Sequence, residues 1–234
     1  MTIENIKWYQ KIWGRILLGI LTIIIAYLLA FSLYVFKLIG SIKNRANITQ
    51  TSIPSATSLD MTKIRATAEN KLSYSIGAAN PKITIVEFSD FECPYCKETQ
   101  PIIQSIVKKY PNDVKLIFRD LPLHDDSKQL AILARCAGEQ QKFWPMHDFI
   151  FENQGNVNEE NLSTMAKSIN INVSNFSSCL NSEKHTKLIE KDVNDAILLN
   201  ISGTPAWIIN GYKIEGSLPA STWEQIINRI LNEK

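Results

Sequence analysis

The sequence predicts an α/β domain that follows one membrane-spanning helix. An apolar run without a charged residue extends from Ile16 to Phe36. Further along, a β-branched run from Lys82 to Phe88 leads to two cysteines, Cys93 and Cys96, and more strand-like segments follow after residue 200. Strand patterns on both sides of a long stretch of helical patterns favour an α/β fold.

The composition is that of a folded protein with balanced charge. The chain has 234 residues, of which 45% are hydrophobic. That is enough for one domain with a core plus an appendage. Because 25 basic residues nearly cancel 23 acidic ones, the net charge is only +2. A field of this size does not favour nucleic acid, which we exclude as a partner.

The apolar run predicts an uncleaved membrane anchor. Its roughly 21 residues span about 32 Å as a helix, close to the thickness of the hydrocarbon layer. A cleaved signal peptide has a shorter apolar region followed by small residues. Bulky residues from Tyr34 to Leu38 occupy that place here, so we expect the helix to be retained.

Basic residues on the two sides of the run do not decide its orientation. They are equal in number, with Lys7, Lys11 and Arg15 before the run and Lys37, Lys43 and Arg45 after it. We place the N-terminus in the cytoplasm because the short leading tail is basic. Disulfide chemistry, which belongs outside the cytoplasm, favours the same orientation.

These patterns divide the chain into four parts. We expect a tail over 1–15, a transmembrane anchor over 16–39, a linker over 40–71 and the domain over 72–234. The linker is polar and lacks a periodic apolar face. A short helix from about Asp60 to Leu72, with Asp60 as its cap, is the one element expected there.

The two cysteines lie where a strand is expected to give way to a helix. The run from Lys82 to Phe88 follows Asn80-Pro81 and predicts a central strand. Cys93 then begins the next helix, with Pro94 near its first position and Pro101 as a kink. A CxxC in this place is typical of a thioredoxin-like redox motif, since a helix N-terminus stabilises a thiolate. Half of a zinc site is the alternative.

The remaining strands are expected at 114–119 and in a hairpin near the end of the chain. Gly203 to Ile209 starts a strand with a proline, and Asn210-Gly211 predicts a two-residue turn into 212–214. An amphipathic helix from Leu218 to Leu231 closes the chain.

The chain resembles the DsbA-type thiol-disulfide oxidoreductases of the thioredoxin superfamily over about 72–234. The matching stretches are Glu87 to Cys96, Lys142 to Asp148, Gly203-Thr204-Pro205 and Asn210-Gly211. The resemblance implies a thioredoxin fold with a helical insertion, which we place at about 127–200. It also implies a cis bond between Thr204 and Pro205, facing the CxxC.

The insertion is expected to be a helical bundle with a second cysteine pair. Helical spacing and caps predict helices over 127–140, 143–153, 158–169, 172–181 and 183–199. Cys136 and Cys179 lie in separate helices, and they are either a structural disulfide or free buried thiols. A zinc site of all four cysteines is not favoured, because there is no second CxxC. We expect no metal and no cofactor.

The resemblance also implies roles for residues near the CxxC. Cys93 is the attacked, exposed sulfur and Cys96 its buried partner. Pro94, Tyr95, Thr204 and Pro205 shape the site, and the backbone beside Pro205 pairs with an extended substrate. Glu87 is either a buried acid that carries a proton or a strand-end acid in solvent.

Other charged residues near the site act on the thiolate in opposite directions. The acids Glu87, Asp90, Glu92 and Glu98 would oppose it and Lys97 would favour it. The two histidines nearest in sequence, His124 and His147, are expected to be packing or surface residues, since thiol exchange requires neither.

The function predicted from these features is the oxidation of exported proteins. A membrane-anchored oxidoreductase would introduce disulfides into reduced or unfolded exported chains on the extracytoplasmic side. The resemblance implies reoxidation by a quinone-linked membrane partner. A disulfide isomerase or reductase is the alternative within the same chemistry, and a chaperone or zinc-binding module is the alternative outside it.

Overall fold

The computed structural model describes residues 12–48, 58–182 and 184–232. The chain divides into two compact units, Met1–Ala56 and Thr57–Lys234, and each is described by itself.

The described residues of the first unit form one long helix, α1 (Ile12–Ile48). Within it, Gly19–Lys37 has a mean hydropathy of 2.3 and is not buried against any other part of the unit. By length and composition this stretch is able to cross a membrane. The predicted anchor at 16–39 lies inside α1, which continues into the predicted linker. Lys7 and Lys11, on which the predicted orientation depends, lie outside the described residues.

The second unit begins earlier than the sequence analysis predicted. A helix, α2 (Ser58–Ala68), lies within the stretch 40–71 that was expected to be a linker. Asp60 lies inside the first turn of α2 and does not precede it as a cap. Arg119 donates to the last carbonyls of α2, those of Thr67 and Ala68, at 3.1 and 2.7 Å. A distant cation thus holds α2, which lies before the predicted boundary at residue 72, on the rest of the unit.

The domain is built on a sheet of five strands in the order β1-β3-β2-β4-β5. Only β2 and β3 are parallel, and the other pairs are antiparallel. The strands are β1 (Tyr74–Gly77), β2 (Ile83–Ser89), β3 (Val114–Asp120), β4 (Ala206–Ile209) and β5 (Tyr212–Glu215). Four of them lie where the sequence predicts strands. The short edge strand β1 was not predicted.

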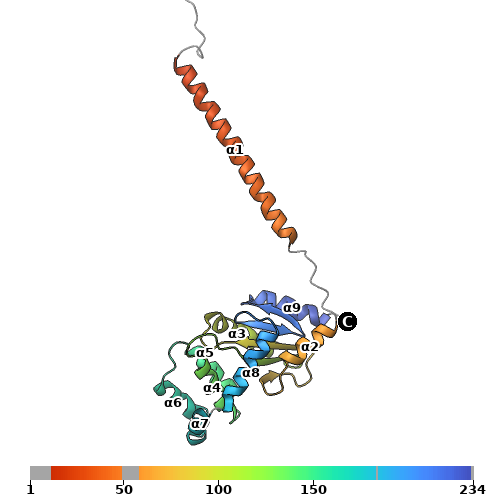
Figure 1. The fold of residues 1–234 in the computed structure, drawn as a ribbon, viewed down its shortest axis with the longest axis vertical. Helices are drawn as coiled ribbons and strands as arrows, with labels where there is room; N and C mark the ends of the chain where they lie inside the picture. The colour runs from red at the N-terminus through yellow and green to blue at the C-terminus, as the bar shows by residue number, and fades with distance from the viewer. Residues whose placement is uncertain (1–11, 49–57, 183, 233–234) are drawn as a thin grey trace, which may run out of the picture. The chain divides into compact units, whose positions relative to one another are not determined.

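Helices cover both faces of the sheet (Figure 1). Because successive side chains of a strand point to opposite faces, the residues of β2 pack alternately against one set of helices and the other. Ile83 and Ile85 pack with α3 (Pro94–Lys109) and α9 (Ala220–Asn232). Val86 and Phe88 pack with α2 and α8 (Lys184–Leu198) on the opposite face. Glu87, two positions after Ile85, therefore faces the side of α3.

The predicted insertion is a group of helices on one side of the domain (Figure 1). It contains α4 (Ser127–Gly138), α5 (Phe143–Glu152), α6 (Glu159–Ser168), α7 (Val173–Leu180) and α8, close to the predicted ranges. Its apolar core is continuous with the loop before the CxxC, since Phe91, Cys93 and Cys96 belong to the same buried cluster as Phe143 and Phe151.

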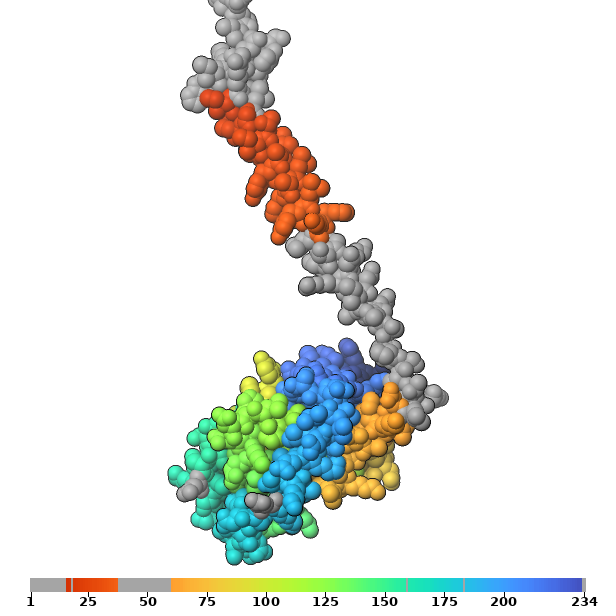
Figure 2. Space-filling model, viewed as in Figure 1, coloured from red at the N-terminus to blue at the C-terminus, as the bar shows by residue number. Residues whose placement is uncertain are grey.

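A buried network of charges joins β3 to the helices of the insertion. Arg119 binds Asp192 at 2.7 Å and Asp195 at 2.5 Å, while Arg135 binds Asp120 and Asp192, each at 2.5 Å. Both arginines are almost completely buried. Burial raises the pKa of Asp120 to about 6, against the effect of Arg135. Figure 2 shows α8, which carries two of the acids, between α4 and α2.

We expect Arg119→Met to lower the free energy of unfolding by about 3 kcal/mol or more, because it leaves buried carboxylates and helix carbonyls without their cation. Denaturant titration of the full chain in detergent measures this loss. The matched control is Arg65→Met, which breaks the exposed pair Arg65–Glu69 and should change stability by less than about 0.5 kcal/mol. Equal effects of the two variants would contradict a structural role for the network.

Candidate functional site

The CxxC lies at the N-terminus of α3, directly after strand β2. Cys93 is the N-cap residue with extended backbone angles, and Pro94 is the first residue of the helix. Proline fits this position because the first N–H of a helix has no partner inside the helix. Cys93 thus lies at the positive end of the helix dipole, as the sequence predicts.

The loop between α8 and β4 covers the Cys93 sulfur. The peptide bond between Thr204 and Pro205 is cis, as predicted. The Cys93 thiol donates to the carbonyl oxygen of Thr204 at 3.4 Å. The carbonyl of Pro205 already accepts from Gly216 N–H at 2.8 Å. With 4% of its surface exposed, Cys93 is less accessible than the sequence analysis expected, because this loop lies against it.

Cys96 lies deeper, on the buried side of α3. It has no exposed surface, and both cysteines of the motif are free thiols in this structure. Burial raises the pKa of Cys96, and the neighbouring carboxyl of Glu87 raises it further. In the reduced pair, Cys96 therefore keeps its proton.

Glu87 is a buried acid beneath the motif and not a strand-end acid in solvent. It is completely buried, and Oε1 accepts a hydrogen bond from Gln100 Nε2 at 2.9 Å. The other carboxyl oxygen has no hydrogen-bond partner among the residues that the structure describes. Burial raises the pKa of Glu87 to about 7, although hydrogen bonds oppose the shift. A carboxyl with this pKa is able to gain or lose a proton at neutral pH.

The Asp90 carboxylate connects the loop before the CxxC to the loop that precedes α4. Its carboxylate accepts from the backbone N–H of Glu92 at 2.8 Å, from that of Leu123 at 2.6 Å, and from the hydroxyl of Ser127. Burial alone would raise the pKa of Asp90, but these hydrogen bonds lower it, with Ser127 first among them. His124 Nδ1 lies 2.8 Å from the same carboxylate.

Glu92 is directed at the N-terminus of α4. Its Oε2 accepts from the N–H of Asp126 at 2.9 Å and from the hydroxyl of Ser127 at 3.2 Å. An anion at a helix N-terminus is stabilised by the free N–H groups and the dipole. Asp90 and Glu92, expected to oppose the thiolate, are thus bound to α4 and its preceding loop.

Two contacts from the end of α5 were missed by the sequence analysis. Gln154 Nε2 donates to the carbonyls of Phe91 and Cys93, each at 2.9 Å. Lys97, which was expected to favour the thiolate, instead donates to the carbonyl of Glu152 at 3.4 Å. A glutamine after a helix carries no recognisable pattern, so no sequence signal pointed to Gln154. These contacts fix the CxxC loop against the insertion.

The two histidines differ in their surroundings. His147 is buried among aromatic rings, including Phe91 and Phe118, and burial lowers its pKa. His124 is half exposed, and the hydrogen bond with Asp90 raises its pKa. His147 is thus a packing residue, while His124 is a surface residue that also contacts Asp90. Tyr95, beside Cys93, has 60% of its surface exposed.

The second cysteine pair is a disulfide. Cys136 of α4 and Cys179 of α7 are bonded, with their Cα atoms 5.7 Å apart. Of the two states that the sequence left open, the structure contains the disulfide. It connects residues 43 positions apart and joins two helices of the insertion.

Comparison with known proteins gives a family for the domain. The family model Thioredoxin_4, described as "Thioredoxin", matches residues 69–229. This range includes both cysteines of the CxxC, the cis proline and the whole insertion.

Two solved structures are similar over the domain. One is a periplasmic thioredoxin-like protein from Salmonella enterica serovar Typhimurium, with 30% identity, a TM-score of 0.62 and alignment over 72% of this chain and 96% of that one. The other is the thiol-disulfide exchange protein alpha-DsbA2 from Wolbachia pipientis, with 20% identity, a TM-score of 0.66 and alignment over 73% and 94%.

A curated relative matches a smaller region. The "Na(+)/H(+) antiporter NhaA 1" of Salinispora arenicola is 33% identical over 144 residues, which cover 60% of this chain and 22% of the antiporter. The chain spans about a fifth of the length of that relative. Taken with the strand, the CxxC, the cis proline and the insertion, the match of the family model shows that the chain belongs to the Thioredoxin_4 family, and its fold is similar to that of alpha-DsbA2.

Proposed function

We propose that this chain is a membrane-anchored oxidoreductase that introduces disulfides into exported proteins through Cys93 and Cys96. The observation that carries the proposal is the arrangement of the pair. Cys93 caps α3 beside the carbonyl of Thr204, and Cys96 lies buried near the carboxyl of Glu87. This arrangement supports attack at the Cys93 sulfur and release of the Cys96 sulfur.

The reaction proceeds by two exchanges at the oxidised pair. A substrate thiolate attacks the Cys93 sulfur, the bond between Cys93 and Cys96 breaks, and its electron pair leaves on Cys96. A second substrate thiolate then attacks the sulfur of the substrate in this mixed disulfide. Cys93 leaves as a thiolate at the N-terminus of α3, and the substrate keeps a disulfide.

Glu87 supplies the proton that Cys96 takes up on release. The pKa of Cys96 is raised by burial, so a Cys96 thiolate is a strong base inside the protein. The pKa of Glu87 is about 7, which leaves a protonated fraction at neutral pH. Gln100 positions the carboxyl through its 2.9 Å hydrogen bond to Oε1.

The substrate lies against the loop that contains Thr204 and Pro205. An extended segment adds to this loop through its backbone, which favours a broad range of sequences. The exposed ring of Tyr95 and the Pro94 ring offer apolar surface beside Cys93. Reduced or unfolded exported proteins are the partners that fit these features.

Helix α1 anchors the chain, with the domain on the extracytoplasmic side. The apolar stretch Gly19–Lys37 supports the anchor. The disulfide between Cys136 and Cys179 supports an oxidising compartment. A quinone-linked membrane protein reoxidises the pair after each cycle. A disulfide isomerase or reductase of the same fold is the alternative, since the direction of electron flow depends on the reduction potential.

We expect Cys96→Ser to accumulate mixed disulfides with exported proteins, because Cys93 remains reactive without its resolving partner. Non-reducing gels of membranes, probed for this chain, would show adducts that disappear with a reductant. Cys93→Ser is the matched control and should form none. Absence of adducts with Cys96→Ser would exclude the oxidoreductase and favour a chaperone or zinc-binding module.

Glu87→Gln should change how stability depends on pH. The pKa of Glu87 rises from 4.5 to about 7 on folding, so the folded chain binds more protons than the unfolded chain between these values. Stability therefore falls as pH rises through this window, by up to about 3 kcal/mol at pH 8. Glu87→Gln lacks this loss. The free energy of unfolding of the variant, relative to that of the parent, should therefore be higher at pH 8 than at pH 4.

Denaturant titrations of the reduced chain from pH 4 to pH 8 measure the effect of Glu87→Gln. Glu98→Gln changes an exposed acid of α3, the helix that covers Glu87, and should keep the pH dependence of the parent. If the proton-carrier role is correct, Glu87→Gln also slows release of Cys96, measured as the rate of reduction of the pair by a thiol. An unchanged rate would rule that role out.

The reduction potential of the Cys93–Cys96 pair separates the oxidase from the reductase. Equilibration with glutathione should give a value closer to about −120 mV, typical of a strong oxidant, than to about −270 mV, typical of thioredoxin. The variant Cys136→Ser/Cys179→Ser ensures that only one pair is measured. A value near that of thioredoxin would favour a reductase.

A further inference from the structure

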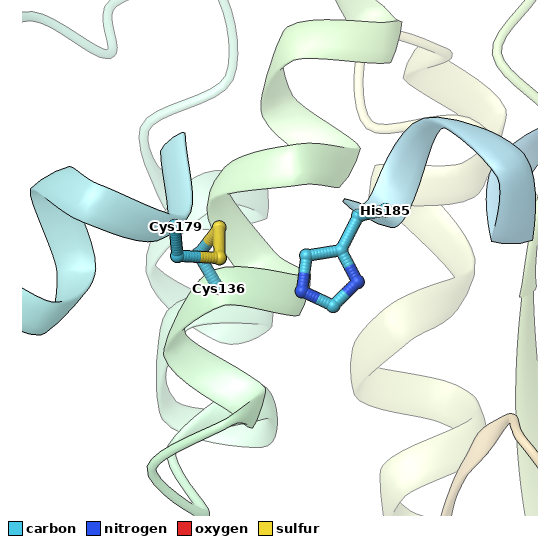
Figure 3. A group of neighbouring side chains, drawn as sticks. All are labelled: Cys136, Cys179 and His185. Carbon is cyan, nitrogen blue, oxygen red and sulfur yellow. A yellow bond between two sulfur atoms is a disulfide. The ribbon is translucent and has the colours of Figure 1, made fainter. Parts of the chain in front are cut away.

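Three side chains with metal-binding atoms lie together in the insertion, away from the CxxC. They are Cys136 of α4, Cys179 of α7 and His185 of α8, and Figure 3 shows the imidazole beside the disulfide. The two sulfur atoms and a ring nitrogen of His185 lie within 4.8 Å of one another. All three residues are buried. The exchange reaction proposed above does not use them.

His185 has coordination capacity that its present contacts do not use. Nε2 lies 2.9 Å from Oε1 of Glu139, and 5% of the side chain is exposed. Nδ1 has no hydrogen-bond partner within the described part of the chain. In Figure 3 the ring nitrogen on the side of the disulfide is Nε2, so a cation on the two sulfurs would take the place of the Glu139 contact at this nitrogen.

Two thiolates and an imidazole are the ligand set of a zinc-like cation. Zn²⁺ binds cysteine sulfur at roughly 2.3 Å in a tetrahedron, which separates two sulfur ligands by roughly 3.8 Å. The bonded sulfurs of Cys136 and Cys179 are closer together than this. The cluster is therefore unable to coordinate through both cysteines while the disulfide is intact, and becomes a complete set of three ligands when it is reduced.

A surface cavity of about 360 Å³ borders the cluster and gives access to it. Its lining includes both cysteines, Glu139 and Lys184. Water in this cavity, or the Glu139 carboxylate beside His185, is available as the fourth ligand. Lys184 lies 2.8 Å from the same carboxylate and opposes a bound cation.

We propose that Cys136, Cys179 and His185 form a binding site for a thiophilic divalent cation such as Zn²⁺, which exists only when their disulfide is reduced. A dithiol reductant supplies two electrons and two protons to the S–S bond and is itself oxidised to a disulfide. The cation then displaces the protons of the two new thiols. Helices α4 and α7 thus have two alternative cross-links, a disulfide in the oxidised chain and a metal ion in the reduced one.

The test uses the full chain in detergent with the substitutions Cys93→Ser and Cys96→Ser, which remove the other dithiol. The disulfide is reduced with a trialkylphosphine, whose oxidation to the phosphine oxide uses the oxygen of water, and the phosphine is removed without air. A thiol assay verifies two thiols per chain. Co²⁺ is then titrated, because thiolate-to-cobalt absorption reports sulfur ligands directly, and Zn²⁺ displaces it.

We expect one Co²⁺ per reduced chain, with thiolate absorption that is absent from the oxidised chain. His185→Gln should weaken the Co²⁺ affinity at least tenfold. Lys184→Gln should strengthen it by removing the opposing charge. His124→Gln, a substitution of a histidine outside the cluster, should leave it unchanged. Zn²⁺ should also raise the melting temperature of the reduced chain and not that of the oxidised chain.

Three results would overturn the proposal. The first is a chain with two verified thiols that binds no Co²⁺. The second is a Co²⁺ affinity that His185→Gln does not change. The third is loss of the helical circular dichroism of the insertion on reduction, because the ligands would then separate. Since Cys93 and Cys96 are absent from this background, none of these results bears on the exchange reaction.

Discussion

The domain depends on a pair of adjacent residues at the end of β3, Arg119 and Asp120. Buried charges are costly unless they are paired, so each element that supplies a partner is held in place. Arg119 requires the acids of α8 and the last carbonyls of α2, while Asp120 requires Arg135 of α4. Two helices of the insertion and the helix before the sheet are therefore fixed to one strand. The insertion and the sheet form one body, and the CxxC lies in the apolar cluster that joins them.

The acids near the CxxC have separate partners in the structure. Asp90 and Glu92 are engaged with the N-terminal region of α4, where N–H groups and a hydroxyl stabilise their charge. Glu87 lies on the other side of the motif, buried beneath α3, and its raised pKa keeps part of its population neutral. The acids of this stretch therefore contact separate elements, Asp90 and Glu92 the region of α4 and Glu87 the buried side of α3, while Cys93 caps the N-terminus of α3.

Much of the fold and the centre of the site could be predicted because their determinants are local. The β-branched run before Cys93, the proline after it, and the asparagine cap of α6 are each recognisable within a few residues. The features that were missed depend on partners far along the chain. Strand β1 lacks a strong pattern of its own and pairs with β3, where Tyr74 lies opposite Phe118, and the attachment of α2 to the domain depends on Arg119. Gln154 acts on the backbone of Cys93 from 61 positions away.

The slight exposure of Cys93 has a consequence for the kind of substrate that the protein accepts. The residue is only 4% exposed and its sulfur contacts the Thr204 carbonyl, so a thiol enclosed in a compact protein has little access to it. A short segment that is still extended meets no such obstacle. In the proposed reaction the low exposure of Cys93 therefore favours extended, unfolded substrate segments over cysteines that are already enclosed in a folded protein.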